Sequence, residues 1–456
     1  MFDLVIRGGS AVTGASVEPL DIAVEDGCIR ELGPQLPGGR EELDARGLTV
    51  FPGLIDVHLH FNEPGRVEWE GAATGSRALA AGGGTLFFDM PLNSSPCTVD
   101  AAAFDAKRTA LEQSSVTDFG LWGGIIPGNR DHLEELAEGG VVGFKAFLCN
   151  SGLPEFPRAD DLTLYEGMRV AAARGLPVAV HAESEEIVSG LARRIRDSGG
   201  SDVRAFLASR PVLAEVEAIQ RAALLAREAG AWLHIVHISS GRGVAAALEA
   251  RARGTNLTIE TCPHYLFFTE EDMVRLGAAA KCAPPLRPAA EADALWQHVL
   301  DGDVDMIASD HSPSSPDLKC DADFFRVWGG IAGVQSRLSV LLEAGHHQRG
   351  LTLPAIAQVA AETPAKRFKI RGKGAIAVGC DADLALVDLS RASTLAQSDL
   401  HQRHPLTPYA GCTFRGTVRR TLLRGRAIFG DGAIVGGPSG RFLRPQIFRQ
   451  QTQETP

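Results

Sequence analysis

Short apolar runs alternate with longer stretches of helical composition through the middle of the chain. Eight such runs lie between residues 51 and 311, and they include GLIDVHLH, GTLFFDM, VVGFKAFL and DMIASDH. The stretches between them are rich in Ala, Leu, Glu and Arg, as in residues 212–229. Near-continuous apolar strands that alternate with helices are typical of a parallel sheet covered by helices. Eight strand–helix units suffice for a closed TIM-like (β/α)8 barrel, which we expect over residues 51–375.

The two ends of the chain have a different pattern. Residues 1–50 hold short alternating strands broken by Gly, Pro and Asp, and the same texture returns after about residue 375. We therefore expect residues 1–50 and 376–456 to form one small β-rich domain, with the barrel inserted between them. The alternative for the middle is an open doubly wound sheet. No G-x-G-x-x-G follows the first apolar run, so a dinucleotide site gains no support.

Composition excludes several classes of function. The formal net charge of -11 argues against a nucleic-acid-binding surface. No segment approaches the ~18 uninterrupted apolar residues of a membrane span, and the N-terminus reads as a strand, not as a signal peptide. The eight cysteines are scattered without a C-x-x-C pair. We interpret them as reduced thiols of a cytoplasmic protein.

Two histidines at the end of the first apolar run are the strongest chemical signal. His58 and His60 are one residue apart, so their side chains leave the same face of a strand. Two neutral imidazoles side by side form half of a divalent-metal site. The alternative is a pair of packed histidines without a ligand.

Further polar residues end later strands, where barrel enzymes carry their chemistry. Asn93 follows FFDMPL, and the others are Lys145, His181, His237 and Asp310. Together with His58 and His60, four histidines, one lysine and one aspartate would converge if the barrel closes.

Lys145 is unusual because it lies inside an apolar strand, and the chain has only seven lysines. An unpaired ammonium is strongly disfavoured there. One interpretation is a buried stem with an amine that reaches solvent. We favour another, in which CO2 adds to the neutral amine and the resulting carbamate bridges two cations. Carbamate, aspartate and a bridging hydroxide would balance most of the charge of two divalent ions.

The expected directions of the remaining side chains decide whether they belong to the site. His234 and His311 should face away from the site, and His264 is left outside the metal ligands. Asp310 can bind a metal and also accept the proton of the attacking water before passing it to the leaving nitrogen. In isolation, Asp310 could equally be a capping residue before Ser312-Pro313.

At this point the motifs resemble a known family. DVHLHFNEPGRVEWEG, DMPLN, GFKAFL, HAE, HISS, ETCPHYL, KCAPPLR, SDHSP and VWGGIAGVQ are similar to the cyclic-amidohydrolase branch of the amidohydrolase superfamily, nearly end to end. Within that branch, EPGRxxWEG with MPLN and WGGIAG points to enzymes that open the ring of allantoin to give allantoate. The resemblance implies a distorted barrel with a flanking β-sandwich. It also implies two metal ions, usually zinc, and commonly a homotetramer.

The resemblance also implies roles for the strand-end residues. His58 and His60 would bind the more buried metal with Asp310, carbamylated Lys145 (N6-carboxylysine) would bridge, and His181 and His237 would hold the second metal. Histidine–carboxylate sites also accept cobalt, manganese or nickel. For the substrate, we expect contacts with Asn93, Ser312, Ala283 and Gly330.

At two positions this chain differs from related families, and these differences narrow the choice of substrate. Dihydroorotases carry an arginine two residues after the second histidine, where this chain has Asn62. Hydantoinases and dihydropyrimidinases carry a tyrosine five residues after the bridging lysine, where this chain has Asn150. Both departures favour allantoin. The rival interpretations are a hydantoinase or dihydropyrimidinase, and a non-catalytic relative that serves as an interaction scaffold.

Overall fold

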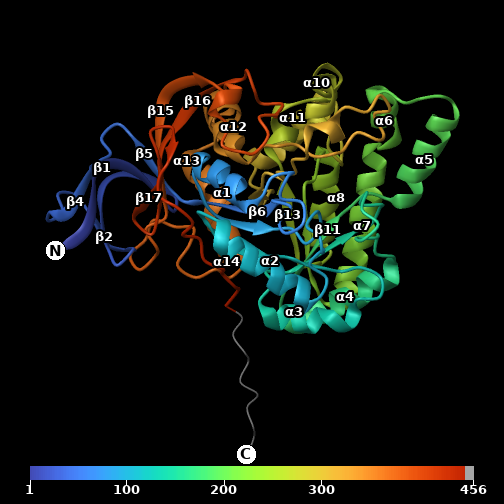
Figure 1. Cartoon of the computed structure of the whole chain (residues 1–456), viewed down its shortest axis with the longest axis horizontal. Helices are drawn as coiled ribbons and strands as arrows, with labels where there is room; N and C mark the ends of the chain where they lie inside the picture. The colour runs from blue at the N-terminus through green and yellow to red at the C-terminus, as the bar shows by residue number, and fades with distance from the viewer. Residues whose placement is uncertain (447–456) are drawn as a thin grey trace, which may run out of the picture.

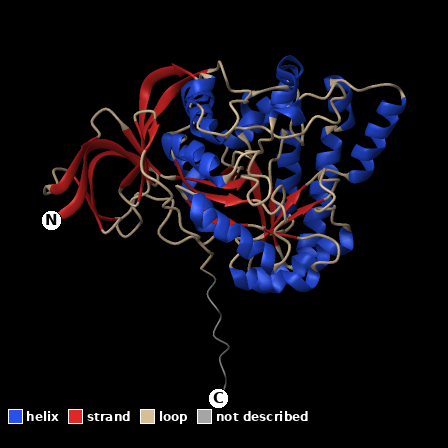
Figure 2. Ribbon diagram, viewed as in Figure 1, coloured by secondary structure: helices blue, strands red, loops and turns tan. Residues whose placement is uncertain are grey.

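The protein has a mixed β-sheet at one end and helix-covered parallel strands at the other (Figure 1, Figure 2). The computed structural model describes residues 1–446. Each of the eight apolar runs in the middle of the sequence contains a parallel strand, and helices lie between them. The predicted mixed α/β architecture is therefore confirmed.

Both ends of the chain contribute to one nine-stranded sheet, seen on the left of Figure 1. Along its main path the order is β18-β17-β16-β15-β5-β1-β2-β3, and β4 pairs with β1. The join between the two ends is antiparallel, with Val50 opposite Leu386. The strands are β1 (Phe2–Thr13), β2 (Ser16–Glu25), β3 (Cys28–Gly33), β4 (Gly39–Asp44), β5 (Thr49–Pro52), β15 (Leu384–Thr394), β16 (Thr413–Leu423), β17 (Arg426–Gly430) and β18 (Ala433–Ile434).

This sheet forms because its strands alternate apolar and polar residues. Ile6, Ile22, Val50 and Leu384 are fully buried and share one apolar cluster. The last ten residues of the predicted range 376–456 lie outside the described residues.

The parallel strands fall into a group of three and a group of six. β8 and β9 are separated only by Trp122 and belong to one apolar run, so the strands occupy eight positions. The first group contains β6 (Leu54–Leu59), β7 (Gly84–Asp89) and β8 (Asp118–Leu121). The second contains β9 (Gly123–Gly124), β10 (Phe144–Phe147), β11 (Pro177–His181), β12 (Trp232–Ile235), β13 (Leu257–Thr261) and β14 (Met306–Ile307).

The helices follow these strands along the chain and cover them on the outside (Figure 2). The predicted helix over residues 212–229 is confirmed as α7, and it ends at Gly230, whose φ of 66° suits a glycine. The helices are α1 (Ala72–Ala81), α2 (Ala101–Ser114), α3 (Leu133–Gly139), α4 (Asp161–Arg174), α5 (Glu185–Asp197), α6 (Val203–Ser209), α7 (Val212–Ala229), α8 (Gly241–Ala252), α9 (Pro263–Phe267), α10 (Glu270–Leu276), α11 (Ala289–Leu300), α12 (Arg337–Val340), α13 (Leu353–Ala357) and α14 (Thr363–Arg367). Within residues 1–446, none of them has both the length and the apolar composition needed to cross a membrane.

Backbone hydrogen bonds connect the first parallel strand to the segment after the last one. The His60 N–H donates to the carbonyl of His311 (2.8 Å), and the Asp310 N–H donates to the carbonyl of His58 (2.9 Å). A parallel bridge joins Leu59 and His311. This seam brings residues about 250 positions apart in the sequence to one end of the strands.

A buried arginine fastens the same seam from inside. Arg337 Nη1 donates to the carbonyls of Ile55 (2.7 Å) and Ile307 (3.2 Å), which belong to β6 and β14. Its Nε lies 3.8 Å from Asp56 Oδ2, and the Asp56 carboxylate accepts from the Ser309 N–H. The guanidinium therefore joins both strands and offsets a buried negative charge.

We predict that Arg337→Met lowers the free energy of unfolding by about 3–5 kcal/mol, because it leaves the Asp56 carboxylate buried without a counter-charge. Urea-induced unfolding followed by circular dichroism measures this change. Arg130→Met, at a largely exposed arginine, is the matched control and should change stability by less than about 0.5 kcal/mol. Equal midpoints for the two variants would contradict the role of Arg337.

Candidate metal centre

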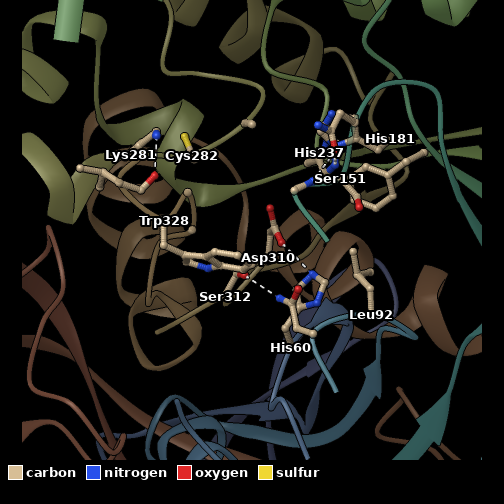
Figure 3. Close-up of a pocket in the computed structure, with 18 of the residues that line it drawn as sticks. His60, Leu92, Ser151, His181, His237, Lys281, Cys282, Asp310, Ser312 and Trp328 are labelled. Carbon is tan, nitrogen blue, oxygen red and sulfur yellow. Dashed lines mark hydrogen bonds and ion pairs between the residues drawn. The ribbon is translucent and has the colours of Figure 1, made fainter. Parts of the chain in front are cut away.

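The four strand-end histidines meet at one end of the parallel strands. The ring centroids of His58 and His60 are 5.6 Å apart, those of His58 and His237 are 5.4 Å apart, and those of His181 and His237 are 4.6 Å apart. Figure 3 shows His60 on one side of the pocket, His181 and His237 on another, and Asp310 between them.

Asp310 faces the first histidine pair. Its Oδ1 lies 3.3 Å from His58 Nε2 and 3.5 Å from His60 Nε2. Burial raises the pKa of this carboxyl, but the two imidazoles outweigh burial, so the pKa falls below its usual range. Asp310 is therefore a carboxylate at neutral pH and can act as a ligand or a proton acceptor.

The backbone is strained at two of these residues. His237 has a φ of 42° and Asp310 a φ of 44°, in the left-handed region that non-glycine residues rarely adopt. The Asp310 N–H bond to the His58 carbonyl holds one of these conformations in place. Such strain is concentrated at functional sites, because it aims a side chain that an ordinary backbone would direct elsewhere.

Lys145 is fully buried, with its Nζ 5.1 Å from the centroid of the ring of Phe147, a residue that lines the cavity. Its amine has no hydrogen-bond partner among the described residues. Burial lowers the pKa of Lys145 to about 8, although the carboxylates of Asp310 and Glu260 oppose the shift. A neutral fraction of the amine is therefore present near pH 7, and a neutral amine is the form that reacts with CO2.

The donor set fits divalent cations. His58, His237 and Asp310 offer ligand atoms that all lie within 4.8 Å of one another. His181 Nδ1 and His237 Nε2 are 3.0 Å apart, and two nitrogen ligands on a tetrahedral zinc would be about 3.4 Å apart. Within residues 1–446, His60 Nδ1, His237 Nδ1 and Lys145 Nζ are buried without a partner. Buried polar atoms are normally satisfied, so these atoms fit a site that is completed by a bound group.

Burial also keeps three of the imidazoles neutral. It lowers the pKa of His60 to about 4, and it lowers the pKa values of His181 and His237 below the ordinary value. Neutral imidazoles offer the lone pair that a cation requires.

Sequence reasoning missed Glu260, which orients two of the histidines. Glu260 Oε1 lies 2.8 Å from His58 Nδ1 and accepts from the His237 backbone N–H at 3.1 Å. Its other oxygen lies 3.0 Å from His234 Nε2. Burial raises the pKa of Glu260, but the neighbouring imidazoles lower it to about 2. A glutamate inside the apolar strand LTIET was a signal of the same kind as Lys145.

Glu183 has a similar role on the other side of the site. Its Oε2 lies 2.8 Å from His181 Nε2, and the same oxygen accepts from Arg210. Carboxylates that hold the second nitrogen of a ligating histidine fix its tautomer and ring orientation.

The remaining histidines occupy different surroundings. His234 is buried against Glu260 and stacks on Trp122, and His311 Nδ1 accepts from the Gly333 N–H. His264 is buried with both ring nitrogens unpaired within the described chain, and its ligand atom lies near those of Cys262 and Asp310. Cys149 lies in a similar group with His181 and Glu183.

The expected substrate residues all line one cavity of about 290 Å³. Asn93 Nδ2 donates to Ser312 Oγ at 3.4 Å. Ala283 and Gly330 line the same cavity. A Cβ at Gly330 would lie 2.1 Å from the Ser312 carbonyl oxygen, so only glycine fits there. Asn150 also lines the cavity, whereas Asn62 donates to the carbonyl of Pro313 behind it.

Comparison with known proteins gives consistent matches. Residues 49–428 match the profile of the family described as Amidohydrolase family. A protein named allantoinase from Solibacter usitatus (strain Ellin6076) is 66% identical over 98% of both chains, and one from Rubrobacter xylanophilus is 57% identical over the same shares. Among solved structures, an L-hydantoinase (dihydropyrimidinase) from Arthrobacter aurescens has a TM-score of 0.95 at 32% identity. The match covers 97% of this chain and 100% of the hydantoinase chain.

We predict that Glu260→Gln weakens metal binding about 10- to 100-fold, because an amide has one acceptor oxygen and cannot accept from both His58 and His234, and because it lacks the negative charge. Titration with a competing chelator measures the affinity. Glu271→Gln, at an exposed glutamate paired with Arg204, should leave it unchanged. An unaltered affinity in Glu260→Gln would mean that this carboxylate does not orient the ligands.

Proposed function

Because this chain belongs to the amidohydrolase family, we propose that it hydrolyses a cyclic amide bond and opens the ring of allantoin to give allantoate. The observation that carries the choice of substrate is the 66% identity, over nearly the whole chain, to a protein named allantoinase. The convergence of His58, His237 and Asp310 supports the type of chemistry.

We propose that two divalent cations, most readily zinc, with cobalt, manganese or nickel as alternatives, bind at the strand ends. His58, His60 and Asp310 would hold one ion, and His181 and His237 the other. Lys145, as N6-carboxylysine, would bridge them. When bound, the ions would supply a Lewis acid for the ring carbonyl and lower the pKa of the attacking water.

Asp310 has the proton-transfer role in this proposal. Its carboxylate would accept a proton from the attacking water as the new C–O bond forms at the ring carbonyl. It would return that proton to the ring nitrogen as the C–N bond breaks. The depressed pKa of Asp310 supports this order, because the group begins as a base.

The cavity residues would orient the ring. Asn93 and Ser312 offer amide and hydroxyl groups at the same place, and at Ala283 and Gly330 the backbone would lie close to the ring. With Asn150 at the position of the hydantoinase tyrosine, no phenol from that position would stabilise the oxyanion.

We also propose a closed barrel, a separate β-sandwich domain, a cytoplasmic location and a homotetrameric assembly. The strand seam at Leu59 and His311 supports a closed (β/α)8 barrel over residues 51–375. The paired chain ends support a separate β-sandwich domain built from 1–50 and 376–456. The eight free cysteines suit the cytoplasm. A homotetramer follows from the family resemblance alone, and sedimentation equilibrium would test it.

The second candidate function is that of a hydantoinase or dihydropyrimidinase, because the overall structure is so similar to one. Steady-state turnover of allantoin, hydantoin and dihydrouracil decides between them. We expect the highest kcat/KM for allantoin. A higher value for dihydrouracil would favour the second candidate.

Lys145→Met tests the bridging role. We expect the variant to bind less metal and to lose at least about 10²–10³-fold in kcat on allantoin, because the charge that joins the two ions is absent. Elemental analysis and an allantoin assay measure the two effects.

Lys369→Met is the matched control, since Lys369 is exposed and remote from the cavity. Full metal content and activity in Lys145→Met would refute the bridge. A wild-type protein that stays inert with metal and bicarbonate supplied would instead indicate a non-catalytic scaffold.

A further inference from the structure

One wall of the cavity is a single irregular segment. The six successive residues 325–330 all line the cavity, and no helix or strand includes them. The chain leaves the site after Ser312 and returns at Ile331, whose carbonyl accepts from the Ser312 N–H at 3.0 Å. We call residues 324–330 the wall segment. Because it lacks regular structure, its carbonyl groups need donors from elsewhere.

A buried lysine supplies the first set of donors. Lys281 Nζ donates to the carbonyls of Phe324 (2.5 Å), Val327 (2.5 Å) and Phe325 (3.3 Å). When the amine is protonated it has three N–H donors, and all of them are used on this segment. The Lys281 carbonyl also accepts from the Gly330 N–H at 2.7 Å, which ties the far end of the segment to the same residue.

A second lysine holds the rest of the wall segment. Lys319 Nζ donates to the carbonyls of Trp328 (2.9 Å) and Gly330 (2.8 Å), and to that of Ala278 (3.2 Å) outside the segment. The Trp328 N–H donates to the carbonyl of Leu318, next to Lys319, at 2.8 Å. The two ammonium groups therefore bind the carbonyls of five residues of the wall segment.

Trp328 depends on this arrangement. Its indole Nε1 is buried without a partner within the described chain, so no hydrogen bond fixes the ring itself. Trp328 makes a T-shaped contact with Trp69, with ring centroids 4.7 Å apart. In Figure 3, Lys281 and Trp328 lie on the opposite side of the pocket from His181 and His237. The Trp328 ring forms part of the cavity wall. Its position depends on the backbone of the wall segment, which the two lysines hold.

We propose that Lys281 and Lys319 are positioning residues that set the part of the cavity occupied by the non-reacting portion of the substrate. This inference rests on the proposed function, in which the reacting ring lies against the histidines and Asp310. The ureido tail of allantoin would then lie toward the wall segment. A contact with a non-reacting group is the same before and during the reaction, so it affects KM more than kcat.

Lys281→Met and Lys319→Met test the proposal. Each leaves up to three buried carbonyls without donors, so we expect KM for allantoin to rise about tenfold. We expect kcat to change by less than about threefold. KM for hydantoin, which lacks the ureido tail, should change much less. Metal content should equal that of the wild type.

A second readout does not depend on activity. Hydrogen–deuterium exchange of residues 324–330 should be faster in Lys319→Met than in the wild type, because the wall segment loses its fastening. Lys369→Met is the control, since it also removes a lysine–carbonyl contact, at Gly175, but far from the cavity. If Lys281→Met does not fold, Lys319→Met decides, because Lys319 is only partly buried.

The outcomes separate the two proposals. Wild-type protein without allantoin turnover refutes the proposed function but leaves the exchange measurement to judge the lysines. Unchanged exchange and unchanged KM in Lys319→Met overturn the positioning role. Equal losses of kcat for both substrates, together with lost metal, would also overturn it, because they would indicate a general structural effect.

Discussion

The amine of Lys145 is buried without a hydrogen-bond partner among residues 1–446, and this constraint governs the rest of the site. Burying a charged ammonium at Lys145 would cost free energy, and burying a neutral amine without a hydrogen bond would also cost free energy. Both costs disappear if the amine becomes a carbamate that is neutralised by cations. The neutral imidazole of His60 and the ionised carboxylate of Asp310 offer ligand atoms for such cations.

The fold supports this constraint by joining distant segments. The seam between the end of β6 and the segment after β14 places His58, His60 and Asp310 side by side, and Arg337 fastens it from inside. Glu260 then connects the seam to His237, because its Oε1 lies 2.8 Å from His58 Nδ1 and also accepts from the His237 backbone N–H. These contacts hold the ligand side chains in place, which would limit the reorganisation that binding and reaction require.

Much of this could be predicted from the sequence. Apolar runs with strand-end polar residues predicted the parallel strands, and the i, i+2 spacing of His58 and His60 predicted their common face. Glu260 was missed because a carboxylate in a strand does not reveal its partners on other strands. Glu183 was missed because the sequence does not show that a carboxylate two residues after His181, beyond the end of the strand, lies against the ring of that histidine. The contacts of the wall segment could not be predicted either, because Lys281 and Lys319 donate to backbone carbonyls, which every residue has.

The most direct measurement is anomalous X-ray diffraction at the zinc edge, from crystals grown with zinc and bicarbonate. We expect two peaks per chain, about 3.5–4 Å apart, with electron density for a carboxyl group continuous with Lys145 Nζ between them. A single peak, or a bare amine at Lys145 with both ions present, would contradict this expectation.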